Sequence, residues 1–152
     1  MKTRIVYAST HHGNTQKVAE AMAASIDAGL VDAVREGVPE VGDCGLVGLA
    51  SGVYFGRFHE SIQRAVREAD FRPGQKVFLV DTCGAGYRDY SKPLRKELEQ
   101  RGVTVVGSFQ CRGYDTYSVF GKLGGIAKGH PNAKDLEAAA LFARQMLDKA
   151  GE

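Results

Sequence analysis

The chain has 152 residues, of which 43% are hydrophobic, and its formal net charge at pH 7 is +2. This size and composition predict one domain with a substantial core, spanning residues 1–152. The small net charge, with basic and acidic residues intermixed, argues against nucleic acid as a partner. There is no apolar run of membrane-spanning length and no charged-then-apolar leader, so we expect a cytoplasmic protein without membrane insertion.

The first predicted strand, residues 4–8, leads into a loop rich in hydroxyl groups that opens directly onto a helix predicted over residues 14–27. The loop and the start of the helix comprise Ser9, Thr10, His11, His12, Gly13, Asn14 and Thr15. Free amides of a first helical turn and the positive end of the helix dipole favour an anion, and hydroxyls add donors. Gly13 permits a positive φ or a close approach of the backbone. Neither a Walker A loop nor a dinucleotide fingerprint is present, so the segment predicts a site for a phosphate monoester.

The next segments predict the edge and the centre of a sheet. A weak strand at residues 30–34 is typical of an edge, and the near-continuous apolar run at 45–50 is typical of a strand covered on both faces. A segment that combines glycine with aromatic residues follows: Ser51, Gly52, Val53, Tyr54, Phe55 and Gly56. A helix is then predicted from the spacing of Phe58, Ile62, Ala65, Val66 and Ala69.

A fourth strand is predicted at residues 77–81, and a second glycine-rich segment follows it: Thr82, Cys83, Gly84, Ala85, Gly86 and Tyr87. Pro93 starts a helix, where its missing N–H is tolerated, and a fifth strand is predicted at residues 103–109. Residues 112–131 show no clear periodicity, and so long a connection is typical of a functional or mobile loop. The last helix begins near Asn132, a suitable N-cap, with an apolar stripe at Leu136, Ala139, Ala140, Ala143 and Leu147.

Alternating strands and helices predict an α/β fold with a doubly wound parallel sheet. Ligands of such sheets bind outside the carboxyl ends of the strands. The hydroxyl-rich loop and the two glycine-rich segments all follow predicted strands, so we expect them at this edge. Exposed backbone and aromatic faces in the latter two suit a flat heteroaromatic ring.

With these segments in this order, the chain resembles a short-chain flavodoxin over essentially its whole length. More closely, it is similar to flavodoxin-like proteins that pair His-His-Gly-Asn-Thr with Gly-Val-Tyr-Phe-Gly-Arg-Phe-His. These proteins also share the later run Cys111-Arg112-Gly113-Tyr114-Asp115-Thr116. The resemblance implies a flavodoxin-like three-layer fold whose five-stranded parallel sheet has the order 2-1-3-4-5. It also implies FMN, bound non-covalently, as the cofactor of one- or two-electron transfer.

The resemblance assigns roles to the same segments. Ser9, Thr10, Asn14 and Thr15 would hold the phosphate, with Gly13 shaping the turn. Residues 52–55 would line one side of the flavin ring, while residues 83–87 would line the other and contact its pyrimidine edge. Ser51, Gly56 and Thr82 complete the expected cofactor site, and no metal or catalytic residue is expected.

Three features depart from the usual flavodoxin pattern. The phosphate loop is one residue longer, with His11 and His12 where a single Thr is common, and these histidines either contact the phosphate or are exposed. The chain has no Trp, which leaves Tyr54 and Tyr87 as candidates for stacking on the ring or for packing under their loops. It is also slightly basic, whereas flavodoxins are usually strongly acidic.

Several functions stay open. The favoured one is an FMN electron carrier, expected to be a monomer, that serves redox partner proteins: a reductase and an electron acceptor. The alternative is an FMN-dependent oxidoreductase such as a quinone reductase or a protoporphyrinogen-oxidising flavodoxin relative. A third is a flavodoxin-fold binding module without FMN. No nucleotide fingerprint for NAD(P)H is present, which favours the carrier.

Alternatives also remain for the cysteines, for Asp81 and for the loop of residues 112–131. An odd number of cysteines without Cys-X-X-Cys spacing predicts neither a disulfide framework nor a zinc site. Cys83 and Cys111 lie at the carboxyl ends of neighbouring predicted strands, where they form a redox pair or place a thiol close to the flavin, or, as is commoner in a cytosolic protein, are buried or loop thiols. Asp81 either accepts a hydrogen bond from the flavin or caps the next turn. The 112–131 loop contacts a ligand or partner, or only shields the sheet.

Overall fold

The computed structural model describes residues 1–10, 13–84, 88–112 and 131–152. The strands are β1 (Thr3–Ala8), β2 (Gly29–Asp32), β3 (Leu46–Tyr54), β4 (Arg57–Phe58), β5 (Lys76–Cys83) and β6 (Thr104–Arg112). The helices are α1 (Asn14–Ile26), α2 (Ala33–Glu36), α3 (Glu60–Glu68), α4 (Lys92–Gln100) and α6 (Ala133–Ala150). Strands and helices alternate along the chain as the apolar pattern predicts.

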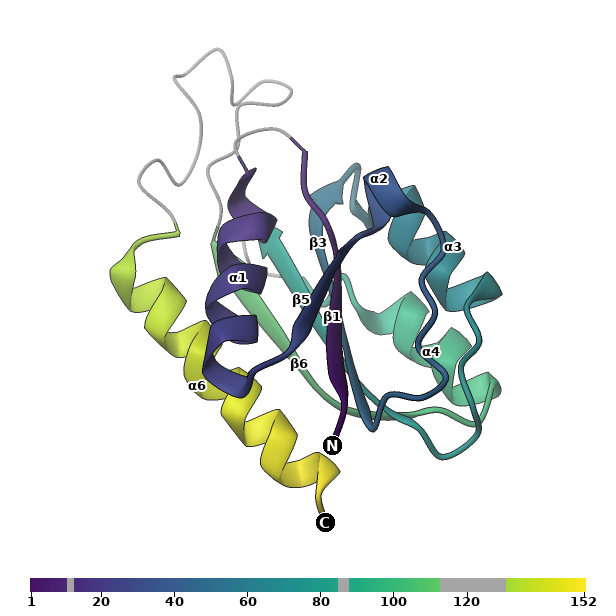
Figure 1. The fold of residues 1–152 in the computed structure, drawn as a ribbon. Coiled ribbons are helices and arrows are strands. Elements are labelled where there is room, and N and C mark those ends of the chain that lie inside the picture. The colour runs from purple at the N-terminus through teal and green to yellow at the C-terminus, as the bar shows by residue number, and fades with distance from the viewer. Residues whose placement is uncertain (11–12, 85–87, 113–130) are drawn as a thin grey trace.

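The sheet confirms the predicted topology. Parallel strands run in the order β2-β1-β3-β5-β6, and the short β4 pairs antiparallel with β3. Because β5 and β6 are the fourth and fifth parallel strands of the chain, this is the expected order 2-1-3-4-5. Both chain ends lie at one edge of the sheet, and the carboxyl ends of the parallel strands point to the opposite edge (Figure 1).

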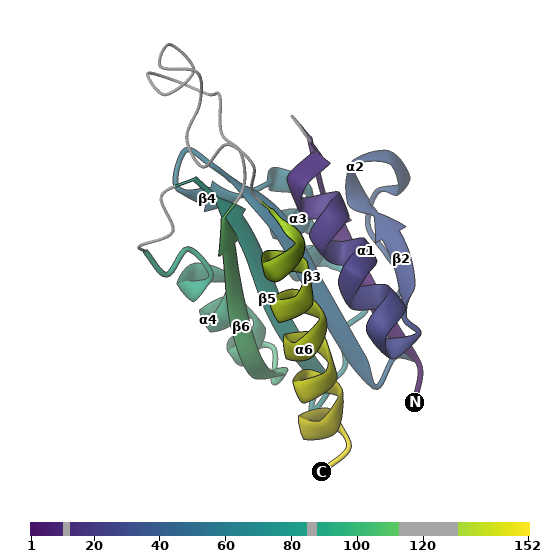
Figure 2. The ribbon, with the colours of Figure 1, turned by 90° about the vertical axis from the view of Figure 1, so that its left-hand side faces the viewer.

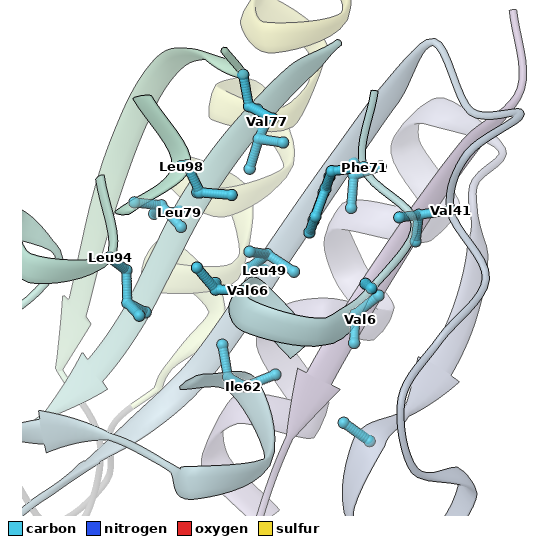
Figure 3. Packing of buried hydrophobic residues seen from close by; sticks show 14 of the residues in the cluster. Val6, Val41, Leu49, Ile62, Val66, Phe71, Val77, Leu79, Leu94 and Leu98 are labelled. Atoms are coloured by element: carbon cyan, nitrogen blue, oxygen red, sulfur yellow. The ribbon is translucent and has the colours of Figure 1, made fainter. Parts of the chain in front are cut away.

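Helices cover the sheet on both faces and form three layers. Helices α1 and α6 lie side by side on one face, as Figure 2 shows, while α3 and α4 cover the other. Each face has its own apolar core. Under α3 and α4, side chains such as Leu49, Ile62, Leu79 and Leu98 interdigitate with no exposed surface (Figure 3). Burial of each such side chain stabilises the folded state by roughly 1.5–3 kcal/mol. The two cores therefore hold the strands in place, and with them the edge of the sheet where the carboxyl ends of the strands lie.

Several boundaries differ from the predicted ones, and each has a local cause. Strand β2 ends at Asp32, because its carboxylate accepts hydrogen bonds from the amides of Val34 and Arg35 and starts α2. The predicted strand through Val34 was therefore wrong in its last two residues. Phe58 belongs to β4 and not to the following helix, which begins at Glu60.

Strands β3, β5 and β6 also continue beyond their predicted ends. Ser51 pairs with Ala8 on one side and Asp81 on the other, so the ladder runs on through residues that resemble a loop in composition. At the last helix, by contrast, the prediction is confirmed: Asn132 is the N-cap of α6. Its side chain accepts from the amide of Asp135, whose carboxylate accepts from the amide of Asn132 in return.

Candidate functional site

The loop after β1 delivers the chain to the N-terminus of α1. Gly13 is the N-cap and has φ 66°, in the left-handed region, as the sequence predicts. The Ser9 hydroxyl accepts a hydrogen bond of 3.1 Å from the amide of Gln16. The first turn of α1 carries no acidic side chain. Its positive dipole end is therefore not offset by a carboxylate of its own, which suits an anionic ligand.

Thr10 connects this loop to the end of β3. Its Oγ1 lies 2.7 Å from the Oη of Tyr54, and its amide donates a longer bond of 3.4 Å to the same oxygen. The two segments that the sequence assigns to phosphate and ring are thus in direct contact. Tyr54 is half-buried, and its ring meets the edge of the His59 ring with the centroids 5.3 Å apart.

Strands β3 and β4 form a hairpin whose tip is Phe55 and Gly56. Tyr54 pairs with Arg57, and both tip residues have positive φ, 52° and 78°. This is the geometry of a two-residue type I′ turn, which favours Asn-Gly and is strained for a phenylalanine. The Phe55 side chain is 100% exposed. Val53, which pairs with Phe58, completes the hairpin ladder.

The base of the hairpin is fixed to helix α3 by Ser51. Its buried hydroxyl donates to the carbonyl of Gly52 at 2.6 Å and accepts from the amide of His59 at 2.8 Å. His59 is the N-cap of α3, and its Nδ1 accepts from the amide of Ser61. The Ser51 side chain is therefore bonded within the protein. A hollow of ≈ 640 Å³ lies beside this hairpin, lined by Tyr54, Phe55, Arg57 and His59 among others.

Thr15 and Thr82 meet inside the protein. Their hydroxyl oxygens lie 2.8 Å apart, and their side chains are 2% and 4% exposed. This bond joins the first turn of α1 to the carboxyl end of β5. Asn14 begins α1, and the buried Gly84 follows β5.

Asp81 is a buried carboxyl group on the opposite face of β5 from Thr82. Its Oδ2 accepts a bond of 3.0 Å from the Nε2 of Gln110 on β6, which also donates to the carbonyl of Arg88 at 2.6 Å. Burial raises the pKa of Asp81 to about 6, although the bonds from Gln110 and Cys83 oppose the shift. Asp81 thus lies within the strand and bonds to β6, which neither interpretation of the sequence anticipated.

The three cysteines are buried thiols. Cys111 pairs in register with Thr82, so Cys83, one residue further, points to the other face of the sheet. Cys83 and Cys111 therefore do not face each other as a redox pair would, and both are buried, as the commoner interpretation of the sequence expects. Burial, with the Asp135 carboxylate adding to it, raises the pKa of Cys111 to about 12.

Some predicted site residues lie outside the described part of the chain. They are His11, His12, Ala85, Gly86 and Tyr87, and with them residues 113–130 of the long loop. Among the residues that the structure does describe, Ser9, Thr10, Gly13, Tyr54 and Thr82 lie at the same edge. Gln110 was not predicted there. The only signal for Gln110 is its place near the end of a strand beside a buried acid.

Within residues 1–10, 13–84, 88–112 and 131–152, no group of three or more His, Cys, Asp or Glu side chains is arranged to hold a metal ion. None of the described helices has the length and apolar character to cross a membrane.

These features define a doubly wound α/β protein with an anion-compatible helix N-terminus beside an aromatic hairpin. A sequence model of the flavodoxin domain matches residues 5–123. An uncharacterized protein of Methanocaldococcus jannaschii is 36% identical over 151 residues, which are 97% of this chain and 99% of that protein. The chain belongs to the flavodoxin family.

Solved structures agree in fold. A flavodoxin from the domain Archaea is similar with a TM-score of 0.69 at 14% identity, covering 99% of each chain. Flavodoxin 2 from Bacillus cereus has a TM-score of 0.69 at 19% identity, over 98% of this chain and 99% of that one. The flavodoxin of Megasphaera elsdenii has a TM-score of 0.61 at 20% identity, over 93% and 98%. At these identities the likeness shows the fold.

Proposed function

We propose that this protein binds FMN and carries one or two electrons between a reductase and an electron acceptor. One observation carries the proposal: Thr10, in the segment that leads from β1 toward α1, is in direct contact with Tyr54 of the aromatic hairpin. A phosphate on the helix and a ring along the hairpin would therefore belong to one ligand. FMN has a phosphate at one end and a flat ring at the other, and when bound it supplies the redox chemistry.

The donor groups fit a phosphate monoester. Backbone amides of the α1 first turn, below Gly13, are the main donors, and no carboxylate of that turn repels an anion. The hydrogen bond from the Gln16 amide holds the Ser9 hydroxyl beside the same turn. Because the Thr15 hydroxyl is bonded to Thr82, Thr15 would contribute its amide and not its hydroxyl.

The flavin ring would lie along the hairpin of residues 52–56 and the segment that follows β5. Tyr54 and Phe55 offer aromatic surface on the hairpin, and the exposed Gly56 leaves the backbone accessible at its tip. Thr82, Cys83 and Gly84 place the opposite segment at the same edge. No general acid or base is assigned, since a carrier needs only to bind, orient and shield the ring.

The cofactor is tested by its spectrum and its chemical identity. The purified full chain should be yellow, and the flavin released on denaturation should co-migrate with FMN, and not with FAD or riboflavin, at one per chain. A chain that neither retains nor rebinds FMN would refute the proposal and favour a flavin-free binding module.

Electron transfer to proteins is distinguished from enzyme activity by turnover. The FMN-loaded protein should consume NAD(P)H slowly with quinones present, and rapidly only when a partner reductase is added. Fast steady-state turnover without a reductase would favour the oxidoreductase alternative. We also propose a single domain over residues 1–152, a monomer and a cytoplasmic location, of which sedimentation or size-exclusion measurements test the monomer.

A further inference from the structure

The side chain of Tyr54 folds back along its own strand. A Cβ built on Gly52, two residues earlier on β3, would lie 2.9 Å from the Tyr54 Oη and 3.1 Å from its Cζ. The phenol ring therefore crosses Gly52, and no side chain larger than hydrogen fits beneath it in this position. Such a placement directs the hydroxyl across the sheet edge to Thr10, at 2.7 Å.

Both ends of this contact are anchored. On the hairpin side, the His59 ring abuts the Tyr54 ring, and the amide of His59 is bonded to Ser51. On the loop side, Thr10 follows Ser9, whose hydroxyl accepts from the Gln16 amide in α1. Thr10, through its hydroxyl and its amide, therefore joins the segment after β1 to a hairpin that is held against α3.

We infer that Tyr54 is a positioning residue that couples the phosphate loop to the hairpin, so that an anion bound at α1 tightens binding of the ring. This inference rests on the proposed function, because it assigns phosphate to the loop and the ring to the hairpin. Coupling of two sites is a free energy, and it acts equally in both directions. The hydroxyl of Tyr54, and not its ring, carries it.

The expected effect follows from one hydrogen bond. A net contribution of about 1 kcal/mol corresponds to an equilibrium shift of about fivefold. Saturating inorganic phosphate should therefore tighten binding of riboflavin, which lacks the phosphate, by about fivefold. In the Tyr54→Phe variant, which keeps the aromatic ring over Gly52, the effect should fall below about twofold.

The experiment titrates the flavin-free full chain with riboflavin, with and without inorganic phosphate, by quenching of flavin fluorescence. Thr10→Val removes the partner hydroxyl from the other side and leaves only the longer contact from the Thr10 amide, so it should also reduce the effect below about twofold. The double variant should show no further loss. Tyr7→Phe is the matched control, since it removes a tyrosine hydroxyl from β1 that is not part of the contact between Thr10 and Tyr54, and it should keep the fivefold effect.

A second readout needs no flavin. Added inorganic phosphate should shift the amide NMR signals of Phe55 and Gly56 in the unaltered chain, and should leave them unchanged in the Tyr54→Phe variant. Equal phosphate effects in both proteins, or no shift at the hairpin of the unaltered chain, would overturn the inference. If neither riboflavin nor FMN binds, the proposed function fails, while the amide shifts still decide the coupling.

Discussion

The hydroxyl groups of Thr15 and Thr82 lie 2.8 Å apart and are both buried. This bond joins the first turn of α1 to the carboxyl end of β5, 67 residues later in the chain. The bond fixes the position of the α1 N-terminus relative to the carboxyl end of β5. Each hydroxyl has the other as its partner, so the loss of one leaves the other buried without compensation.

Replacing either threonine by valine should lower the free energy of unfolding by about 1–3 kcal/mol, because one buried hydroxyl stays unsatisfied. The double variant Thr15→Val/Thr82→Val should lose less than the sum of the two, since both polar groups are gone. Urea unfolding of the four proteins measures this coupling. Strictly additive losses would show that the contact contributes nothing.

Asp81 predicts an unusual dependence of stability on pH. Its folded pKa of about 6 exceeds the unfolded value of 3.8, so folding favours the protonated form. Its stabilisation is fully present below pH 3.8 and is lost as the pH rises through 6. Relative to Asp81→Asn, the unaltered protein should lose about 2 kcal/mol between pH 4 and pH 8. Urea unfolding across this range checks it, and a constant difference between the two proteins would contradict it.

Asp70 serves as the control of opposite sign. The pKa of Asp70 is lowered, and the largest cause is the hydrogen bond of 2.7 Å that the amide of Val41 donates to its Oδ1. Its stabilisation is therefore present above the unfolded pKa and is lost as the pH falls through the folded one. Asp70→Asn should be less stable than the unaltered protein at neutral pH, and the two should converge in acid. Persistence of the difference at the lowest pH would show that the charge is not the cause.

We predict that a substitution at the hairpin tip can relieve backbone strain. Phe55 has φ 52°, and its ring is exposed and contributes no packing. Asparagine tolerates this conformation, so Phe55→Asn should raise the free energy of unfolding by roughly 1 kcal/mol. Phe55→Ala removes the ring but keeps a side chain that disfavours positive φ, and it should give no such gain. Thermal unfolding compares them, and an equal gain in both would assign the effect to the exposed ring.

Much of the fold can be predicted from local patterns in the sequence. Runs such as residues 45–50 and the spacing along α6 mark strands and helices because apolar side chains must face a core. The ends of β3 and β5 were predicted too short, since Ser51, Gly52 and Thr82 have the composition of a loop. Pairing with neighbouring strands decides such ends, and it is not encoded in the segment itself.

The candidate site was predicted less completely, for the same reason. The sequence places hydroxyls and aromatic residues at one edge, but the partner of each is tertiary. Thr10 with Tyr54, and Thr15 with Thr82, join residues from separate elements. The hairpin turn was also not predicted, because Phe55-Gly56 lacks the Asn-Gly pair that marks such turns.

The opposite facing of Cys83 and Cys111 has a consequence for electron flow. A disulfide requires both side chains on the same side of the sheet, whereas here the backbone of two strands separates the thiols. The edge that would carry the flavin therefore has two sulfur atoms nearby but no dithiol couple between them. If FMN binds at this edge as proposed, the flavin would have no disulfide between these two cysteines to reduce, and its electrons would pass to another molecule.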